Sequence, residues 1–384
     1  MIPISIPNLT GNEDKYLTEC IETGFVSSVG AFVPRFAEHV ADTSGASFCA
    51  PLSSGTAGLH LALLTAGVGR DDLVIMPSLT FIATANAAAY CGADPWLMDV
   101  DPASWTLDPE ELKQNLSSET SVKNGQLFHA KTGRRVAAIM PVYMLGTPAD
   151  MDAISAIANS YDLPVICDAA AALGAKYKGQ DIGKLDVTAT VFSFNGNKTF
   201  TCGGGGAVIS KNQGFIERIN HLATTARTGQ GYDHDMVGYN YRMTNIQAAV
   251  GCAQLERFDE FLNEKKRVAL KYKKAFEHLE YVLPFPTPDW AESAHWLSGA
   301  YLSLAETDIE SLIQILRRAK IDVRPFWKPL HLQAPYASAL RCSLDITESI
   351  YSRIVPLPCS THLADTDRQQ VICCVKSTLK NLER

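Results

Sequence analysis

Val165-Ile166-Cys167-Asp168-Ala169-Ala170 and, further along, Val191-Phe192-Ser193-Phe194-Asn195-Gly196-Asn197-Lys198 are the two stretches that decide the predicted fold. Each begins as an apolar run, as expected of a strand buried on both faces of a sheet, and ends in polar residues. Ligands in open α/β sheets bind beyond the carboxyl ends of the strands. Asp168 and Lys198 are therefore candidate site residues, although an aspartate here could also cap a helix and an isolated lysine is usually a solvated surface residue.

Similar apolar runs occur throughout the first two-thirds of the chain and alternate with helical patterns. Asp108 and Asp150 stand in front of two of these patterns as capping residues. The alternation predicts an α/β fold in which a mixed, mostly parallel sheet is flanked by helices. The predicted strands are residues 73–76, 96–100, 136–143, 165–167, 188–194 and 207–210.

The pattern changes after Ser210. Helices are predicted at residues 213–223, 308–319 and 365–382, and one long amphipathic helix at residues 244–279, with Ile246 and Leu270 on its apolar stripe. We expect a large domain over residues 1–255 that includes the N-terminal segment. A smaller α+β domain over residues 256–384 would include the end of the long linking helix.

The composition excludes several classes of protein. The 384 residues are 46% apolar and 20% charged, which is an ordinary globular balance and argues against disorder. The formal charge of −7 is poorly suited to neutralising a phosphate backbone, so we expect no nucleic-acid partner. The ten cysteines include no CxxC pair, which favours buried thiols in a cytoplasmic protein over disulfides or a metal site.

One segment is long enough to be considered as a membrane span. Residues 73–93 carry no charged side chain, but they contain Pro77, Ser78, Thr80 and Asn86. A buried strand followed by a buried helix explains this segment better, so we expect no membrane partner. The first residues also lack the basic start and apolar core of a signal peptide.

Two further motifs bear on chemistry. In Leu52-Ser53-Ser54-Gly55-Thr56-Ala57 an apolar run breaks and a helix of small residues begins, and such a helix start can bind an anion or simply be capped. Four glycines at residues 203–206 allow close approach of another group, but no Gly-Lys-[Ser/Thr] follows them. A Walker-type NTPase is therefore not expected.

Taken together, the helix start, Asp168 and Lys198 match the requirements of pyridoxal phosphate. A lysine forms a Schiff base with this cofactor, an aspartate keeps its pyridine nitrogen protonated, and a helix start holds its phosphate. This combination predicts a cofactor-dependent enzyme.

At this point the chain resembles the nucleotide-sugar aminotransferases of the DegT/DnrJ/StrS family, whose members have the type I fold of pyridoxal-phosphate enzymes. The resemblance extends over nearly the whole chain, and its motifs are specific because so many of them occur in the same order. They are residues 11–13, 24–30, 54–57, 77–84, 99–101, 168–170, 192–198, 238–249 and 324–331.

The resemblance implies a role for each matching residue. Lys198 would carry the cofactor and transfer the proton, and Asp168 would face the pyridine nitrogen. Phe81 would stack on the cofactor ring, although it could also be a core residue. The remaining cofactor contacts implied are Gly55, Thr56, Ala57, Ser193 and Asn195, with Asn240 and Arg242 reaching across from the partner subunit of a homodimer with shared active sites.

One position departs from the family pattern. Many relatives have a polar residue three positions after the pyridine aspartate, near the ring oxygen of the cofactor, where this chain has Ala171. Either Asn195 or a water molecule would then serve that oxygen, or the oxygen would have less support. The departure concerns the electronics of the cofactor and leaves the class of reaction unchanged.

The implied reaction transfers an amino group from L-glutamate to C4 of a nucleotide-linked 4-keto-6-deoxy sugar for a bacterial surface glycan. UDP-2-acetamido-2,6-dideoxy-4-keto-hexose is the expected substrate, with GDP- or dTDP-linked keto sugars as alternatives. Aromatic and arginine side chains suit sugar faces and diphosphates. The residues expected around the sugar nucleotide are Phe25, Ser28, Arg324, Trp327 and His331, of which Trp327 and His331 could equally be packing residues.

The sequence also leaves open a function of a different class, that of a regulatory protein. Some proteins with this fold bind the cofactor as regulators without turnover. The acidic chain shows no DNA-binding appendage, which favours the enzyme. Absorption spectra with and without glutamate would distinguish the two.

Overall fold

A computed structural model describes residues 1–382, and its centre is an eight-stranded mixed sheet. Two four-stranded sheets, β17-β3-β2-β6 and β1-β11-β10-β7, are joined through bridges from Ile139 to Val165 and from Val142 to Asp168. Four strand pairs are parallel, and β11 is antiparallel to both β10 and β1. The strands are β1 (Phe48–Leu52), β2 (Leu73–Pro77), β3 (Asp94–Met98), β6 (Val136–Ile139), β7 (Ile166–Asp168), β10 (Ala189–Ser193), β11 (Gly206–Ser210) and β17 (Leu340–Arg341).

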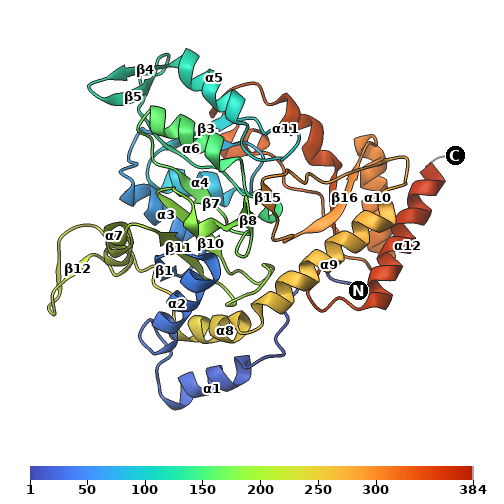
Figure 1. The fold of residues 1–384 in the computed structure, drawn as a ribbon, viewed down its shortest axis with the longest axis horizontal. Helices are drawn as coiled ribbons and strands as arrows, with labels where there is room; N and C mark the ends of the chain where they lie inside the picture. Colours follow the sequence, from blue (N-terminus) through green and yellow to red (C-terminus); the bar gives the residue numbers. More distant parts are fainter. Residues whose placement is uncertain (383–384) are drawn as a thin grey trace.

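Helices cover both faces of this sheet, which confirms the predicted fold class (Figure 1). Alternate residues of one strand pack into two different cores, as the two-residue period of a strand requires. In β2, Leu73 and Ile75 belong to one core and Val74 and Met76 to the other. The helices of this part are α1 (Glu13–Glu22), α2 (Phe32–Ser44), α3 (Gly55–Thr65), α4 (Ala83–Tyr90), α5 (Pro109–Glu119), α6 (Met151–Ser160), α7 (Gln213–Ala223) and α8 (Asn245–Leu255).

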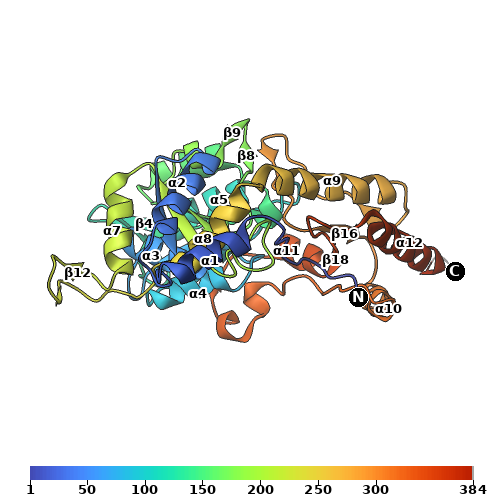
Figure 2. The same cartoon turned by 90° about the horizontal axis from the view of Figure 1, so that it is seen from below.

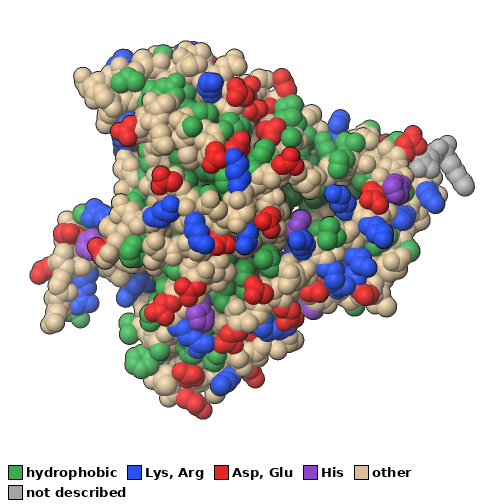
Figure 3. Space-filling model, in the orientation of Figure 1, with side chains coloured by type: hydrophobic (Ala, Val, Ile, Leu, Met, Phe, Trp, Pro, Cys, Tyr) green, Lys and Arg blue, Asp and Glu red, His purple; other side chains and the backbone are tan. Residues whose placement is uncertain are grey.

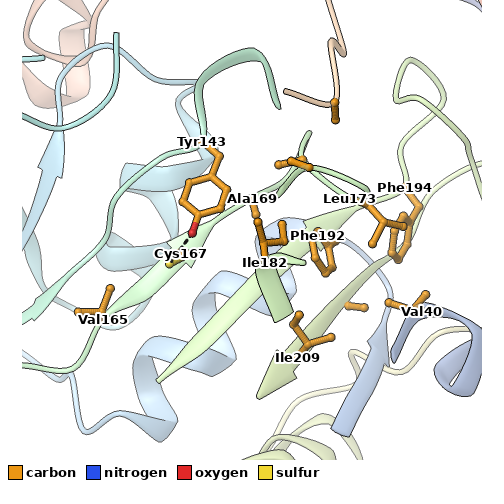
Figure 4. Packing of buried hydrophobic residues seen from close by; sticks show 14 of the residues in the cluster. Val40, Tyr143, Val165, Cys167, Ala169, Leu173, Ile182, Phe192, Phe194 and Ile209 are labelled. Carbon is orange, nitrogen blue, oxygen red and sulfur yellow. Dashed lines mark hydrogen bonds between the residues drawn. The ribbon is translucent and has the colours of Figure 1, made fainter. Parts of the chain in front are cut away.

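Figure 4 shows part of the first core, next to the strand ends that carry the candidate site. Phe192 and Phe194 of the β10 segment are almost fully buried there, and Phe194 packs edge-on against Phe36 of α2 at a centroid distance of 5.2 Å. The Tyr143 hydroxyl donates a hydrogen bond to Cys167 Sγ at 3.5 Å. This packing fixes the backbone from which Asp168 and Lys198 extend.

A second, smaller unit lies at the other end of helix α9 (Figures 1 and 2). The three strands β14-β16-β18 and helices α9, α10 and α12 enclose a core of their own, which also contains Ile2 from the chain start. The elements of this part are β14 (Val282–Leu283), β16 (Ser298–Leu302), β18 (Ile354–Leu357), α9 (Phe258–Phe276), α10 (Glu306–Arg318), α11 (Asp345–Ile350) and α12 (Asp365–Leu382).

Later segments also return to the larger part of the molecule, one to the large sheet and one to a separate three-stranded sheet. β17 pairs with β3, and β15 (Ala291–Glu292) pairs with β8 (Lys176–Tyr177), which in turn pairs with β9 (Gln180–Asp181). The boundary at residue 255 therefore remains a prediction. Two hairpins complete the fold: β4 (Thr120–Lys123) with β5 (Gln126–His129), and β12 (Arg227–Thr228) with β13 (Asp233–His234), which projects from the body in both views (Figures 1 and 2).

The prediction of one continuous helix over residues 244–279 was wrong, because the chain breaks between α8 and α9. Arg257 has φ −116° and ψ 13°, outside the helical region. Side chains at the break bind the N-terminal segment: Glu256 Oε2 accepts from Asn12 Nδ2 at 2.7 Å and Arg257 Nη1 donates to Thr10 Oγ1 at 2.6 Å. Ile246 and Leu270, predicted on the apolar stripe, are 36% and 53% exposed.

The segment considered as a membrane span consists of β2 and α4, as predicted. Within residues 1–382, none of the helices has the length and apolar character needed to cross a bilayer. On the face shown in Figure 3, acidic and basic side chains are interspersed.

Candidate active site

A cavity of about 270 Å³ opens beyond the carboxyl ends of β7 and β10, which is where open α/β sheets bind ligands. The start of α3 and the segment before α4 form further walls. Of the predicted cofactor residues, the cavity is lined by Gly55, Thr56, Phe81, Asp168, Ser193, Asn195 and Lys198. Folding thus brings residues from four separate segments of the sequence to one place.

Asp168 lies at the end of β7 and is 6% exposed. Its Oδ2 accepts a hydrogen bond from Thr84 Oγ1 at 2.7 Å, and its Oδ1 accepts one from the Ala170 N–H at 3.1 Å. Burial raises the pKa of this carboxyl, while the two hydrogen bonds and the nearby Lys198 act in the opposite direction. A buried carboxylate of this kind is well placed to pair with a cationic ring nitrogen.

Lys198 lies in the turn between β10 and β11. Its backbone N–H donates to Asn195 O at 3.0 Å, which closes the turn. Desolvation lowers the pKa of the amino group to about 8, and the negative charge of Asp168 partly opposes this shift. Among the described residues that line the cavity, Lys198 and Asp168 are the only charged ones.

The start of α3 forms the third wall. A Cβ atom at Gly55 would lie 2.8 Å from Ser193 Cβ, so glycine is required for this close approach. Ser54 caps the helix by accepting from the Ala57 N–H at 3.0 Å. Ala57 therefore has its N–H occupied and does not line the cavity, whereas Gly55 and Thr56 do. The first N–H groups of a helix have no partner within the helix and can bind a phosphate.

Phe81 lines the cavity and is 54% exposed, so a large aromatic face is available to a planar ligand. It lies 5.8 Å from the ring of Trp327, which also lines the cavity. Ala171 is part of the wall as well, and the polar residues Asn195 and Asn197 lie in the same lining.

The remaining predicted residues are placed elsewhere. Phe25 is 51% exposed and lies outside the cavity lining. Ser28 is half-buried and also lies outside it, and the Arg324 side chain is 70% exposed beside Asp322. His331 is buried, with Nδ1 2.7 Å from Ser78 Oγ and Nε2 3.1 Å from Glu348 Oε1. It joins the end of β2 to the C-terminal part and does not face the cavity.

Asn240 and Arg242 are exposed and do not line the cavity of their own chain. Their backbone is fixed against α7 and β1, through bridges from Asn240 to Thr224 and from Arg242 to Leu52. Both side chains are free to reach a second subunit, so their predicted role across a dimer interface stays a prediction.

The structure also adds residues that the sequence analysis did not assign. Thr84 donates to Asp168, and Tyr143, Asn197 and Trp296 belong to the cavity lining. Thr84 could have been suspected, because it follows Thr80 by four residues in a mostly apolar segment; the two hydroxyl oxygens are 2.8 Å apart. Trp296 lies nearly 100 residues from Lys198 in sequence, and no local pattern indicates it.

Comparison with known proteins establishes the class. The model of the DegT/DnrJ/EryC1/StrS aminotransferase family matches residues 7–376, and the chain belongs to this family. It is 37% identical to the GDP-perosamine synthase of Caulobacter vibrioides, with 98% of each chain covered. It is also 35% identical to the GDP-perosamine synthase of Escherichia coli O157:H7, over 98% of this chain and 97% of the relative.

Solved structures agree with this assignment. A DegT/DnrJ/EryC1/StrS aminotransferase from Brucella abortus has a TM-score of 0.86 at 27% identity, with 95% of each chain covered. The protein is therefore a pyridoxal-phosphate-dependent sugar aminotransferase, and the predicted fold, enzyme class and cofactor are confirmed. The cavity fits the cofactor, because it offers an amine, a buried carboxylate, a free helix start and an exposed aromatic face.

Proposed function

We propose that the protein transfers an amino group from L-glutamate to C4 of a GDP-linked 4-keto-6-deoxyhexose. The observation that carries the transferase chemistry is the cavity in which Lys198, Asp168 and the start of α3 meet. The choice of nucleotide rests on the relatives. Proteins named GDP-perosamine synthase match from three organisms at 37%, 35% and 32% identity, so the GDP-linked alternative has better support than the UDP-linked substrate predicted first.

The residues of this chain divide the work. Pyridoxal phosphate, when bound, supplies an electron sink that makes the hydrogen on the amine-bearing carbon acidic. The Asp168 carboxylate would keep a ring nitrogen protonated, because a negative charge nearby favours the protonated form. The N–H groups of Gly55 and Thr56, with the hydroxyl of Ser193, would hold the phosphate, and Phe81 would offer its aromatic face to the ring.

Lys198 carries the proton in this scheme. Its Nζ atom would take the proton from the amine-bearing carbon of the substrate and would donate it to the carbon that receives the amino group. A general base works best when its pKa lies near the pH of the reaction, and the pKa of about 8 meets that requirement. An ordinary lysine with a pKa near 10.4 would be almost fully protonated and unable to accept the proton.

The test is a side-by-side assay of the purified protein with L-glutamate and GDP-, UDP- or dTDP-linked 4-keto-6-deoxy sugars. We expect amination of the GDP sugar with the highest kcat/KM. Preferential use of the UDP or dTDP sugar would overturn the proposed nucleotide but leave the aminotransferase in place. Failure of glutamate to change the cofactor absorption would contradict the catalytic role and support cofactor binding without turnover.

We further propose a homodimer in which Asn240 and Arg242 complete the partner's cavity. Support comes from their exposure and from the rigid backbone contacts that hold their segment against α7 and β1. Sedimentation in the presence of cofactor tests the assembly, and a catalytically competent monomer would contradict it.

A further inference from the structure

The amino group of Lys198 lies on the face of a tryptophan. Its Nζ atom is 3.7 Å from the ring centroid of Trp296, a side chain that is only 3% exposed and lines the same cavity. Tryptophan offers an ammonium group the strongest attraction of the aromatic side chains, and the attraction grows when water is excluded. A buried amine that has lost its hydration shell gains most from such a face.

Trp296 is tied to the same turn that carries the lysine. The indole Nε1–H donates to the Asn197 carbonyl at 2.7 Å, and Asn197 is the residue directly before Lys198. The Trp296 backbone N–H donates to Leu145 O at 3.1 Å, which fixes the other end of the residue to the cavity wall. The ring and the lysine therefore keep their relative positions.

A second lysine, Lys265 on α9, holds the backbone of Trp296. It is 1% exposed, and its Nζ donates to Trp296 O at 2.9 Å and to Cys359 O at 2.7 Å. Burying an ammonium group is costly unless its hydrogen bonds are satisfied. Lys265 connects α9 with Trp296 and with the segment that follows β18, and none of the roles proposed above requires a charged group in this place.

We propose that Trp296 is a positioning residue for Lys198. Its indole face would hold the Lys198 amino group in the cavity whenever this amino group is not bonded to the cofactor, and Lys265 keeps the indole in place. The inference rests on the role proposed for Lys198. A lysine held on this face stays within reach of the substrate carbon, which an unrestrained four-carbon side chain would not. Among the described residues that line the cavity, the Asp168 carboxylate is the one charged group besides Lys198 itself, and its charge acts on the amine.

The test measures the pKa of Lys198 in the full-length, cofactor-free protein, by competitive acylation at a series of pH values and mass spectrometry of the Lys198 peptide. Tryptophan analogues with increasing numbers of fluorine atoms are introduced at position 296 alone, because fluorine weakens the π-face while nearly preserving the shape. The pKa should fall stepwise, by about 0.5–1 unit over the series, since the protonated form loses stabilisation. An unchanged pKa over the series would overturn the proposal.

The same analogues at position 290 are the matched control. Trp290 also donates through its indole N–H, to Pro148 O at 3.2 Å, but it does not line the cavity. An equal fall of the Lys198 pKa in this control would also overturn the proposal.

Lys265→Met tests the support for the indole. It should change the Lys198 pKa as well, with folding checked by circular dichroism, and an unchanged pKa in a folded variant would remove Lys265 from the proposal. Cofactor attachment is measured on every variant. If the unmodified protein does not attach the cofactor at Lys198, the role of Lys198 itself is contradicted.

Discussion

Thr84 Oγ1 donates a 2.7 Å hydrogen bond to Asp168 Oδ2, and this bond joins the first turn of α4 to the end of β7. The Thr84 hydroxyl is also 2.8 Å from that of Thr80, so the two threonines and the carboxylate form a short buried chain. The hydrogen bond fixes the orientation of the carboxylate and opposes the rise of its pKa that burial causes. The hydrogen bond from Thr84 thereby favours the ionised form of the Asp168 carboxyl.

Thr84→Val tests this relationship, because it removes the hydroxyl at nearly constant shape. A hydrogen bond to a charged group contributes about 1.5–3 kcal/mol, so we expect kcat/KM to fall by at least roughly tenfold. Thr65→Val is a matched control, since the Thr65 hydroxyl is buried without a hydrogen-bond partner. Equal kinetics for Thr84→Val and the unmodified protein would contradict the role.

Lys198→Ala should abolish covalent attachment of the cofactor. Mass spectrometry after borohydride reduction measures it directly, with the added mass expected on the peptide that contains Lys198. Lys184→Ala is the control, because Lys184 is an exposed lysine that pairs with Asp181 at 2.9 Å. Attachment at full occupancy in Lys198→Ala would show that another lysine carries the cofactor.

The rate at which the cofactor attaches to Lys198 should also rise with pH. Only the neutral amine attacks the aldehyde, so the rate with cofactor-free protein should rise with pH and level off above about 8. An exposed lysine would show its midpoint near 10.4. Asp168→Asn removes the charge that raises the Lys198 pKa and should move the midpoint to lower pH; a move to higher pH would contradict the assigned cause.

His331→Gln should affect stability more than substrate binding, in contrast to the substrate role expected from the sequence. Its two ring nitrogens lie within hydrogen-bond distance of Ser78 and Glu348, and burial lowers its pKa, so the neutral ring occupies this place. We expect a loss of about 1–3 kcal/mol in the free energy of unfolding. His278→Gln, at a 90% exposed side chain, is the control. A large rise in KM for the sugar nucleotide without loss of stability would restore the substrate role.

Shared active sites can be tested by mixing two inactive variants, Lys198→Ala and Arg242→Ala. In a mixed dimer one site contains both mutations and the other contains neither. Random reassociation of a symmetric dimer should therefore restore about a quarter of the activity. No recovery, with mixed dimers shown by native mass spectrometry, would place Arg242 outside the partner's site.

Local sequence patterns were sufficient to predict most strands of the sheet and to identify the candidate lysine and aspartate. Buried parallel strands require consecutive apolar residues, and their carboxyl ends face the ligand side, so β7 and β10 with Asp168 and Lys198 could be predicted. The cap at Asp108 was equally readable, and its side chain accepts from the Glu110 N–H at 2.8 Å. The break between α8 and α9 was not, because it depends on contacts of Glu256 and Arg257 with the first residues of the chain.

Which side chains meet in the cavity was decided by tertiary packing. Trp296 is brought onto Lys198 by hydrogen bonds to Leu145 and Lys265, and His331 is drawn away from the cavity by Ser78 and Glu348. Such contacts join residues far apart in sequence, and they depend on how whole elements pack rather than on any local periodicity. The sequence by itself therefore identified the cofactor chemistry, while the environment that tunes the amine and the carboxylate came from the packing of distant segments.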